Sequence, residues 1–282
     1  MNYIVIPAYQ PDNKLIKLIE KIHEKSDFHI LVIDDGSSSE CQKIFDKAEQ
    51  YATVIRHQVN QGKGQALKTA FTYIQEQNIY GTVVTADADG QHKVWDIFRT
   101  ANKASENPNK LILGVRAFSG KVPLRSRFGN SLTKTLFKLQ TGVGVTDTQT
   151  GLRAFTTNLI PFMLKIEGQR YEYEMNMLLE ATKEYQILEV PIETVYINDN
   201  EGSHFRPIRD GLMIYKNIFK FALSSLSSFV VDYIVYAIAI LFLPTAPTNF
   251  RIFLANGLAR VTSSIFNYST NKKLVFKNDD SL

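Results

Sequence analysis

The chain has 282 residues, 44% of them hydrophobic, which is enough for a sizeable core and excludes a disordered or fibrous protein. Its net charge of +4 is mild, and no basic block interleaved with aromatic residues predicts a nucleic-acid partner. The single cysteine, Cys41, excludes an internal disulfide and is typical of a reducing compartment. The N-terminus has no basic segment and no long apolar run, so we expect no signal peptide and a first domain in the cytoplasm.

Strands and helices are expected to alternate through the first two thirds of the chain. Short apolar runs predict strands at 3–6, 30–33, 53–57, 83–85, 111–114 and 192–197, with Pro7 ending the first. Apolar residues at helical spacing predict helices at 12–25, 66–75 and 171–180. This alternation is typical of a doubly wound, mostly parallel α/β sheet.

Acidic residues follow two of these strands, at the edge where parallel α/β sheets bind ligands. Asp34 and Asp35 follow the second strand, and Asp87 and Asp89 follow the fourth. Two carboxylates at such an edge suit a hard divalent cation that also holds substrate phosphates. We therefore expect a metal and nucleotide-diphosphate site, although Asp-x-Asp alone is a common pattern in a chain with 28 acidic residues.

A glycine-rich turn at residues 60–64 (NQGKG) precedes the helix expected at 66–75. Such a turn can approach an anion closely. It is not a P-loop, because no Ser or Thr follows Lys63, and it is not a dinucleotide fingerprint, because the third glycine is missing.

Four short motifs follow one another along the first domain: Pro7-Ala8-Tyr9, residues 34–37 (DDGS), residues 60–64 (NQGKG) and residues 87–91 (DADGQ). In this order they resemble the motifs of family 2 glycosyltransferases with the GT-A fold. Within that family the chain is most similar to dolichol-phosphate mannose synthases and bacterial polyprenyl-phosphate glycosyltransferases. The resemblance continues through residues 114–116, 126–131 and 147–153, and it implies a GT-A catalytic domain over residues 1–205.

The resemblance implies a donor site at the first four motifs. The residues that would hold the base and ribose of the sugar nucleotide are Pro7, Ala8, Tyr9, Asp34 and Asp35, with Lys63 near the same pocket. Those that would hold Mg²⁺ or Mn²⁺ on the diphosphate are Asp87 and Asp89, with Ala88 and Gln91 close by. Pro11 stands where many members have Glu, which is a departure at the nucleotide end of the site.

The acceptor end depends on Arg116, Arg127 and Ser131, which match positions that receive the acceptor phosphate in lipid-phosphate-using members. A phosphate monoester is already a nucleophile at neutral pH, so transfer to it needs cations more than a general base. Arginine gives forked contacts to phosphate, although surface ion pairs are the alternative here. Asp147 either caps its Thr/Gly-rich turn or lies beside the acceptor. Glu174 either contacts donor hydroxyls or is solvated on a helix surface.

The composition changes after residue 205. Apolar and basic residues at helical spacing over 206–220 suit an amphipathic helix on an anionic bilayer surface, with a core helix as the alternative. Residues 221–243 carry one charge, Asp232, and at about 1.5 Å per residue they span a hydrocarbon core of roughly 30 Å. A second, more polar span containing Arg260 is expected at 250–268. Basic flanks at both ends predict a hairpin over 221–282 with both ends in the cytoplasm.

The hairpin resembles the first half of a GtrA-like membrane domain, especially at residues 255–260, 266–268 and 271–273. Asp232 and Arg260 reach the same depth in an antiparallel hairpin. Because an isolated charge is costly in the hydrocarbon core, we predict an ion pair between them. Contact with a partner subunit or with further membrane helices is the alternative.

These expectations describe a multi-pass protein of the cytoplasmic membrane whose catalytic domain faces the cytoplasm. It would be an inverting, metal-dependent enzyme that moves a hexose from UDP-glucose or UDP-N-acetylglucosamine to polyprenyl (undecaprenyl) phosphate, for cell-envelope glycan or teichoic acid decoration. Its partners would be the nucleotide sugar, the polyprenyl phosphate and the lipid bilayer, and a homo-oligomer is compatible with the sequence. The alternatives are a saccharide or diacylglycerol acceptor, with Asp147 as the base, and a non-catalytic nucleotide-sugar-binding membrane scaffold.

Overall fold

The computed structural model describes residues 1–116, 134–135, 137–138, 141–193, 207–242 and 247–272, with only the backbone described over 207–222. The chain divides into two compact units, Met1–Phe205 and Arg206–Leu282. Two predicted site residues, Arg127 and Ser131, lie outside the described residues, and so do the side chains of the amphipathic segment expected at 206–220.

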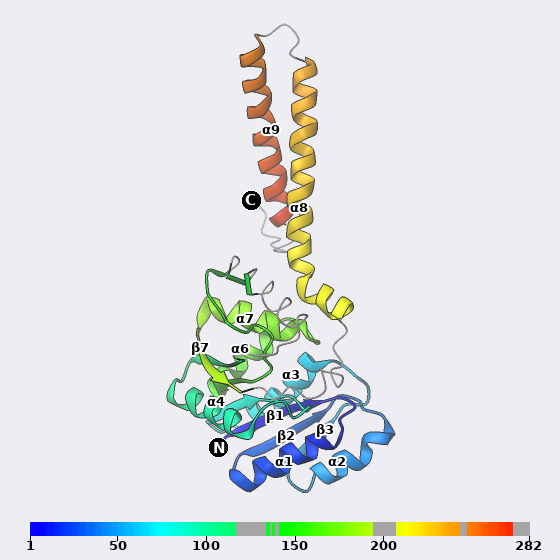
Figure 1. The fold of residues 1–282 in the computed structure, drawn as a ribbon, viewed down its shortest axis with the longest axis vertical. Coiled ribbons are helices and arrows are strands. Elements are labelled where there is room, and N and C mark those ends of the chain that lie inside the picture. The colour runs from blue at the N-terminus through cyan, green and yellow to red at the C-terminus, as the bar shows by residue number, and fades with distance from the viewer. Residues whose placement is uncertain (117–133, 136, 139–140, 194–206, 243–246, 273–282) are drawn as a thin grey trace. The chain divides into compact units, whose positions relative to one another are not determined.

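The first unit contains a seven-stranded sheet with the order β3-β2-β1-β4-β6-β5-β7 (Figure 1). The strands are β1 (Tyr3–Ala8), β2 (His29–Asp34), β3 (Thr53–Arg56), β4 (Thr82–Thr85), β5 (Lys110–Arg116), β6 (Arg153–Thr156) and β7 (Gln186–Ile192). Neighbouring strands run parallel, except that β6 is antiparallel to both β4 and β5. The predicted mostly parallel α/β fold is therefore confirmed.

Helices form a layer on each side of this sheet (Figure 1). One layer contains α1 (Asn13–Lys25), α2 (Gln42–Ala48) after the 3-10 turn η1 (Ser39–Cys41), and α4 (Val94–Glu106). The other contains α3 (Lys63–Glu76), α6 (Ile160–Lys165) after the 3-10 turn η2 (Thr157–Leu159), and α7 (Glu172–Glu184). Alternate residues of β1 explain this arrangement, because Ile4 and Ile6 pack into the core under the first layer while Tyr3 and Val5 are buried under the second.

The strand β1 continues through Pro7 to Ala8, whereas we expected Pro7 to end it. Pro7 pairs with Ile33 in parallel register. The carbonyl of Val5 accepts a hydrogen bond from Ala86 on the β4 side, and Pro7, two residues on, directs its nitrogen to the same side. Because β4 has already ended there, the missing N–H of Pro7 leaves no partner unsatisfied.

The strand predicted at 192–197 is wrong in position, because β7 spans Gln186–Ile192 and residues 194–197 lie outside the described residues. Pro191 lies within β7, and a proline inside a segment argues against a strand when only the sequence is read. The position of β7 at the end of the sheet explains why a proline is tolerated there, since an edge strand has unpaired backbone groups on one side.

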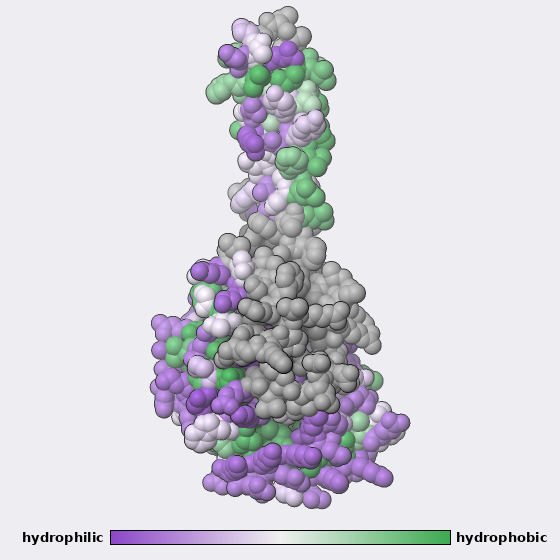
Figure 2. Space-filling view, viewed as in Figure 1, coloured by the Kyte–Doolittle hydropathy of each residue, from purple (hydrophilic) through white to green (hydrophobic). Residues whose placement is uncertain are grey.

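The second unit is a helical hairpin formed by α8 (Pro207–Phe242) and α9 (Thr248–Thr270). Within α8, Leu223–Phe242 is long and apolar enough to cross a membrane, and Figure 2 shows apolar side chains along the hairpin surface. Among the described residues α8 is the one helix that meets this measure, so a second crossing stays a prediction. The contact between the helices uses small residues, because small side chains let helix backbones approach closely; those buried in the hairpin are Ser224, Ser228, Ala239, Ala255, Ala259 and Ser263.

The predicted ion pair within the hairpin is confirmed as a contact. Arg260 Nε lies 3.8 Å from Asp232 Oδ1, and the Ser263 hydroxyl donates a hydrogen bond of 3.0 Å to the same oxygen. The Arg260 side chain is 76% exposed on the surface of the hairpin, whereas that of Asp232 is 19% exposed.

Candidate active site

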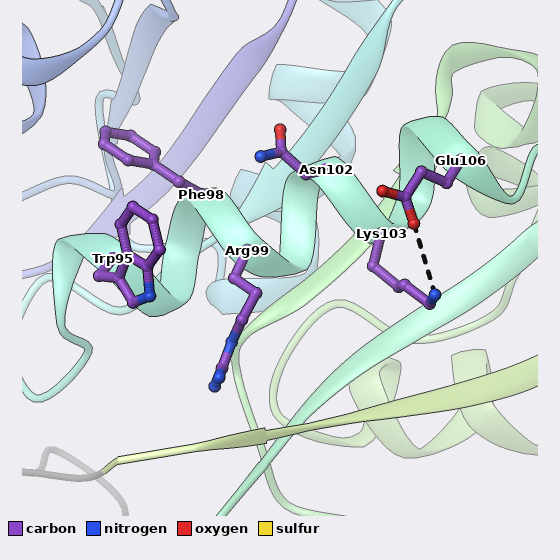
Figure 3. A pocket seen from close by; sticks show the side chains of 6 residues that line it. All are labelled: Trp95, Phe98, Arg99, Asn102, Lys103 and Glu106. Carbon is purple, nitrogen blue, oxygen red and sulfur yellow. Dashed lines mark hydrogen bonds and ion pairs between the residues drawn. The ribbon is translucent and has the colours of Figure 1, made fainter.

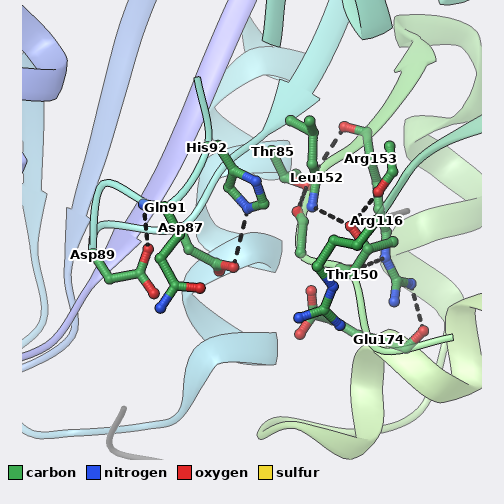
Figure 4. A network of polar contacts seen from close by, with 12 residues as sticks. Thr85, Asp87, Asp89, Gln91, His92, Arg116, Thr150, Leu152, Arg153 and Glu174 are labelled. Atoms are coloured by element: carbon green, nitrogen blue, oxygen red, sulfur yellow. Dashed lines mark hydrogen bonds and ion pairs between the residues drawn. The ribbon is translucent and has the colours of Figure 1, made fainter. Parts of the chain in front are cut away.

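The candidate site is built where β4 ends, and Figure 4 shows its polar contacts. The Thr85 hydroxyl donates a hydrogen bond of 2.7 Å to the carbonyl of Gly151, which ties the end of β4 to the loop before β6. Two residues further on, Asp87 extends from this edge, followed by Asp89. Both carboxylates are therefore placed at the carboxyl end of a central strand, as the sequence predicted.

The carboxylate of Asp87 is held by two cationic or polar side chains. Lys63 Nζ lies 2.7 Å from Asp87 Oδ1 and 2.9 Å from Glu174 Oε2, and His92 Nε2 lies 3.3 Å from Asp87 Oδ2. Burial favours the neutral form of Asp87, but the nearby Lys63 and His92 outweigh it and hold its pKa well below the usual range. Lys63 therefore lies beside Asp87, and Glu174 is paired with Lys63, with its side chain 12% exposed, instead of being solvated on a helix surface.

Asp89 has a different environment. Its Oδ1 accepts a hydrogen bond of 3.0 Å from the backbone N–H of Gln91, and burial followed by the negative charge of Asp87 raises its pKa above the usual value. The two acids thus form a locally negative pair in which Asp87 is neutralised by Lys63 and Asp89 is not.

This pair fits a divalent cation only in part. Within the described parts of the chain, no three His, Cys, Asp or Glu side chains gather as a ready metal site. Asp87 and Asp89 supply oxygen ligands of the kind that Mg²⁺ and Mn²⁺ prefer, and such ions usually take their other ligands from substrate phosphates and water. Burial, and then the negative charge of Asp87, raise the pKa of Asp89, and a bound cation would favour its charged form. The residues therefore fit a metal that is completed by the donor diphosphate.

Besides His92, two further site residues, both in the stretch 147–153, were given no role from the sequence. A Cβ atom on Gly151 would lie 2.6 Å from Asp87 Oδ1, so only glycine allows the carboxylate to rest on this backbone. Arg153, 1% exposed, donates from Nε to the carbonyl of Thr150 at 3.1 Å and from Nη1 to that of Glu174. An arginine inside a buried strand is an unusual sequence feature, and it is the signal that could have revealed this residue.

At the nucleotide end, Asp35 is 3% exposed and its carboxylate is already engaged. It accepts hydrogen bonds from the backbone N–H groups of Gln61 at 2.9 Å and Gly62 at 2.8 Å, and His57 Nδ1 lies 2.9 Å away. Asp35 therefore fixes the glycine-rich turn to the end of β2. The structure therefore gives Asp35 a role in holding this turn, and its contact with the nucleotide stays a prediction.

Other predicted nucleotide residues surround this point. Asp34, 6% exposed, accepts a hydrogen bond of 2.9 Å from the Ser37 backbone N–H, and Tyr9 is 39% exposed. Gln10 adopts φ of 50°, and it is held there because its N–H donates to the Ser37 hydroxyl at 2.9 Å. The loops after β1 and β2 are thus joined, with Ala8 buried beneath them.

The glycines of residues 60–64 are explained by protein packing and not by a bound anion. A Cβ on Gly64 would lie 2.5 Å from Tyr173 Cβ, and one on Gly62 would lie 2.5 Å from the Gln169 carbonyl. The backbone N–H of Gln65 also donates to that carbonyl at 2.8 Å. The first turn of α3 is therefore covered by the segment that leads into α7.

Of the residues predicted at the acceptor end, the structure brings Arg116 and Asp147 together. Arg116 Nε lies 2.6 Å and Nη2 3.0 Å from the two oxygens of Asp147, which is fully buried. The Gln149 backbone N–H also donates to Asp147 at 3.1 Å. Asp147 therefore both caps its turn and orients the Arg116 guanidinium, and a carboxylate held in this fork is poorly placed to act as a base.

A hollow on α4 is separate from these residues (Figure 3). It is lined by Trp95, Phe98, Arg99, Asn102, Lys103 and Glu106. Lys103 pairs with Glu106 at 3.4 Å, and Arg99 pairs at 2.8 Å with Asp96, which lies outside the lining, so each charged group of the hollow already has a partner. This hollow has no chemistry that competes with the site at β4.

Solved structures define the class. Glucosyl-3-phosphoglycerate synthase from Mycobacterium tuberculosis, in complex with Mn²⁺, UDP and phosphoglyceric acid, is similar with a TM-score of 0.58 at 16% identity, over 78% of this chain and 76% of that one. Mannosyl-3-phosphoglycerate synthase from Rubrobacter xylanophilus has a TM-score of 0.54 at 17% identity, over 71% and 68%. These likenesses show the fold, and the first unit is a GT-A domain.

The chain belongs to glycosyl transferase family 2, which it matches over residues 3–162. Residues 216–282 match the GtrA/DPMS transmembrane domain, so the second unit indicates membrane association. The chain is 29% identical to UDP-N-acetylglucosamine–dolichyl-phosphate N-acetylglucosaminyltransferase of Methanococcus voltae, over 69% of this chain and 85% of that protein. It is 25% identical to human dolichyl-phosphate beta-glucosyltransferase, over 76% and 72%.

Proposed function

We propose that this protein transfers a hexose from UDP-glucose or UDP-N-acetylglucosamine to a polyprenyl phosphate, with inversion at the anomeric carbon. The observation that supports it most directly is the combination of a family 2 domain and a GtrA/DPMS transmembrane domain in one chain. Such a chain brings a water-soluble donor and a lipid acceptor to one enzyme. The relatives from Methanococcus voltae and human are named as an N-acetylglucosaminyltransferase and a beta-glucosyltransferase that act with dolichyl phosphate.

The reaction needs positive charge at two places. A phosphate oxygen of the acceptor forms a bond to the anomeric carbon while the bond to the donor diphosphate breaks, and the electron pair leaves with UDP. Asp87 and Asp89 would hold Mg²⁺ or Mn²⁺, which supplies charge to the departing diphosphate. Lys63 already contacts Asp87, so its ammonium group would also lie within reach of the diphosphate oxygens.

The acceptor phosphate would be received by Arg116, with Arg127 and Ser131 from outside the described residues. A guanidinium has five N–H donors, so it can hold Asp147 and a phosphate together. Asp147 then serves to orient Arg116, and the reaction needs no base because the phosphate is already ionised at neutral pH. This arrangement favours a phosphate acceptor over the saccharide or diacylglycerol alternative.

We also propose that the hairpin crosses the cytoplasmic membrane twice, with the first unit on the cytoplasmic side. Leu223–Phe242 is the first crossing and α9 the second, and basic residues flank both outer ends. Nucleotide sugars would then meet the acceptor phosphate at the cytoplasmic face. A homo-oligomer is compatible with this arrangement.

A transfer assay tests the proposal. The full chain in detergent is incubated with radiolabelled UDP-glucose or UDP-N-acetylglucosamine, undecaprenyl phosphate and Mn²⁺, and label is expected in a lipid that butanol extracts and mild acid cleaves. Label that enters a saccharide or diacylglycerol instead would replace the acceptor in this proposal. If no donor in a wider panel gives labelled product, the protein is not the proposed enzyme.

The metal is tested in the same assay. EDTA should abolish transfer and Mg²⁺ or Mn²⁺ should restore it, because the diphosphate leaves with uncompensated charge when no cation is bound. Asp89→Ala should lower transfer by roughly a thousandfold with every cation, since it removes the carboxylate that Lys63 does not neutralise. Glu180→Gln, on the exposed surface of α7, is the matched control and should retain activity. Full activity in EDTA contradicts the metal-dependent mechanism.

A further inference from the structure

The clearest unexplained feature of the site is the ion pair between Lys63 and Asp87, because Asp87 is one of the two proposed metal ligands. Asp87 Oδ1 is taken by Lys63 at 2.7 Å, and Asp87 Oδ2 faces His92 Nε2 at 3.3 Å. Both oxygens therefore have partners before any cation arrives. In this arrangement Asp89 is the one carboxylate of the pair that can accept a metal without displacing another side chain.

Asp87 has little freedom to resolve this conflict by moving. The carboxylate rests on the backbone of Gly151, where even a Cβ atom would lie 2.6 Å from Oδ1. Its side chain also follows a strand that is hydrogen-bonded on both sides, to β1 and β6. The lysine, on a flexible four-carbon stem at the first turn of α3, is the partner that can move.

Glu174 provides a pivot for that movement. Its Oε2 lies 2.9 Å from Lys63 Nζ, and its Oε1 is buried without a hydrogen-bond partner among the described residues. Arg153 holds the backbone carbonyl of Glu174, so the pivot is itself fixed. A lysine that leaves Asp87 keeps a buried carboxylate partner, and it still has N–H donors for a phosphate oxygen.

We propose that Lys63 is an exchangeable counter-cation: it holds Asp87 while the donor is absent and moves to the donor diphosphate, pivoting on Glu174, so that the divalent metal can bind Asp87. This inference rests on the proposed function, because it takes a nucleoside diphosphate as the ligand that attracts Lys63. Metal and nucleotide then bind with positive cooperativity. By linkage, each raises the affinity of the other by the same factor.

The contacts of Lys63 agree with this role. Its ammonium group lies between two carboxylates, 2.7 Å from Asp87 Oδ1 and 2.9 Å from Glu174 Oε2, and both favour its charged form in the donor-free state. A fixed positive charge beside Asp87 opposes a divalent cation until a phosphate draws it away.

The experiment measures Mn²⁺ binding to the full chain in detergent, by the electron paramagnetic resonance signal of free Mn²⁺, with and without UDP. For the unchanged protein, UDP should raise Mn²⁺ affinity by at least about tenfold. This is the change expected when Lys63 exchanges one charge-assisted hydrogen bond, from Asp87 to the diphosphate. For Lys63→Met, Mn²⁺ should bind about tenfold more tightly without UDP, and UDP should add less than about threefold. Lys68→Met, one turn further along α3, is the matched control and should behave like the unchanged protein.

Lys63→Arg keeps the charge and guards against a folding defect in Lys63→Met. A guanidinium forks a carboxylate more rigidly, so this variant should bind Mn²⁺ no more tightly than the unchanged protein without UDP, and its UDP effect should be smaller. Equal Mn²⁺ affinity of Lys63→Met and the unchanged protein without UDP overturns the inference, as does a UDP effect that is absent from the unchanged protein. The measurement contains no acceptor lipid, so its failure is separate from a failure of the transfer assay.

Discussion

At the scale of single residues, the position of Asp87 depends on the absence of a side chain at Gly151. Gly151 supplies a flat backbone surface on which the carboxylate lies, and its carbonyl accepts a hydrogen bond from the Thr85 hydroxyl. The sequence gives no direct sign of this contact, because 64 residues separate Gly151 from Asp87. Packing against Asp87 requires glycine here, because the backbone of Gly151 is not in the left-handed region.

We expect Gly151→Ala to lower transfer by roughly a hundredfold, because the added methyl group displaces the Asp87 carboxylate by a large part of an ångström. Gly144→Ala is the control, since a Cβ there meets nothing within 4 Å. Both variants are compared by the initial rate of labelled lipid formation and by thermal unfolding. A Gly151→Ala enzyme that keeps more than half its rate contradicts the packing account.

Arg116 and Asp147 form a second residue-scale test, because they make a pair in which one member is buried. Arg116→Ala leaves a fully buried carboxylate without its cation, and should lower the free energy of unfolding by about 3 kcal/mol. Asp147→Asn should cost less, since Arg116 is 19% exposed and can turn toward water. Denaturant unfolding of both variants measures the difference, and an equal or reversed order would contradict this account of the pair.

At the scale of elements, the sequence predicts which segments are strands better than how they pair. Apolar runs are local signals, so β1 to β5 fall near their expected positions. The antiparallel β6 was missed because it is a run of four residues that begins with a buried arginine, and its place between β4 and β5 depends on contacts far apart in the sequence. The position of Asp87 and Asp89 at the edge of the sheet can be predicted from the apolar run of β4. Their partners on α3 and α7 cannot, because they depend on how those helices pack.

The contact between α3 and α7 brings Lys63 to Glu174, and it depends on Gly64. We expect Gly64→Ala to push α7 away from α3, because a Cβ there would lie 2.5 Å from Tyr173 Cβ. Overpacking of this kind costs about 1–3 kcal/mol, so the melting temperature should fall. The UDP effect on Mn²⁺ affinity should also become smaller, since Lys63 loses the carboxylate on which it pivots away from Asp87. An unchanged melting temperature would show that the helices adapt without cost.

At the scale of the whole molecule, the proposed function divides the two substrates between the two units. The first unit has the edge of a sheet, with charged groups that suit a diphosphate, and the second has an apolar hairpin that suits a lipid. The sequence predicts this division because hydropathy is a local property. It does not predict how the helices of the hairpin fit together, which depends on the small residues between them and on three polar side chains.

Those side chains give the last prediction. Asp232 accepts a hydrogen bond from Ser263 at 3.0 Å and has Arg260 Nε at 3.8 Å, so the hydroxyl is the closer partner. Polar contacts between membrane helices contribute on average about 0.6 kcal/mol, because the separated helices also find partners. We therefore expect Asp232→Asn, Arg260→Gln and Ser263→Ala each to lower the melting temperature in detergent.

Double-mutant cycles then separate the two contacts. The coupling energy between Asp232 and Ser263 should be about 0.5–1.5 kcal/mol, and that between Asp232 and Arg260 should be smaller, because the arginine side chain is mostly exposed and its contact is longer. Ser264→Ala, on the exposed side of α9, is the control for Ser263→Ala and should show no coupling to Asp232. Coupling that is strong for Arg260 and absent for Ser263 would mean that the charge pair, and not the hydroxyl, sets the register of the two helices.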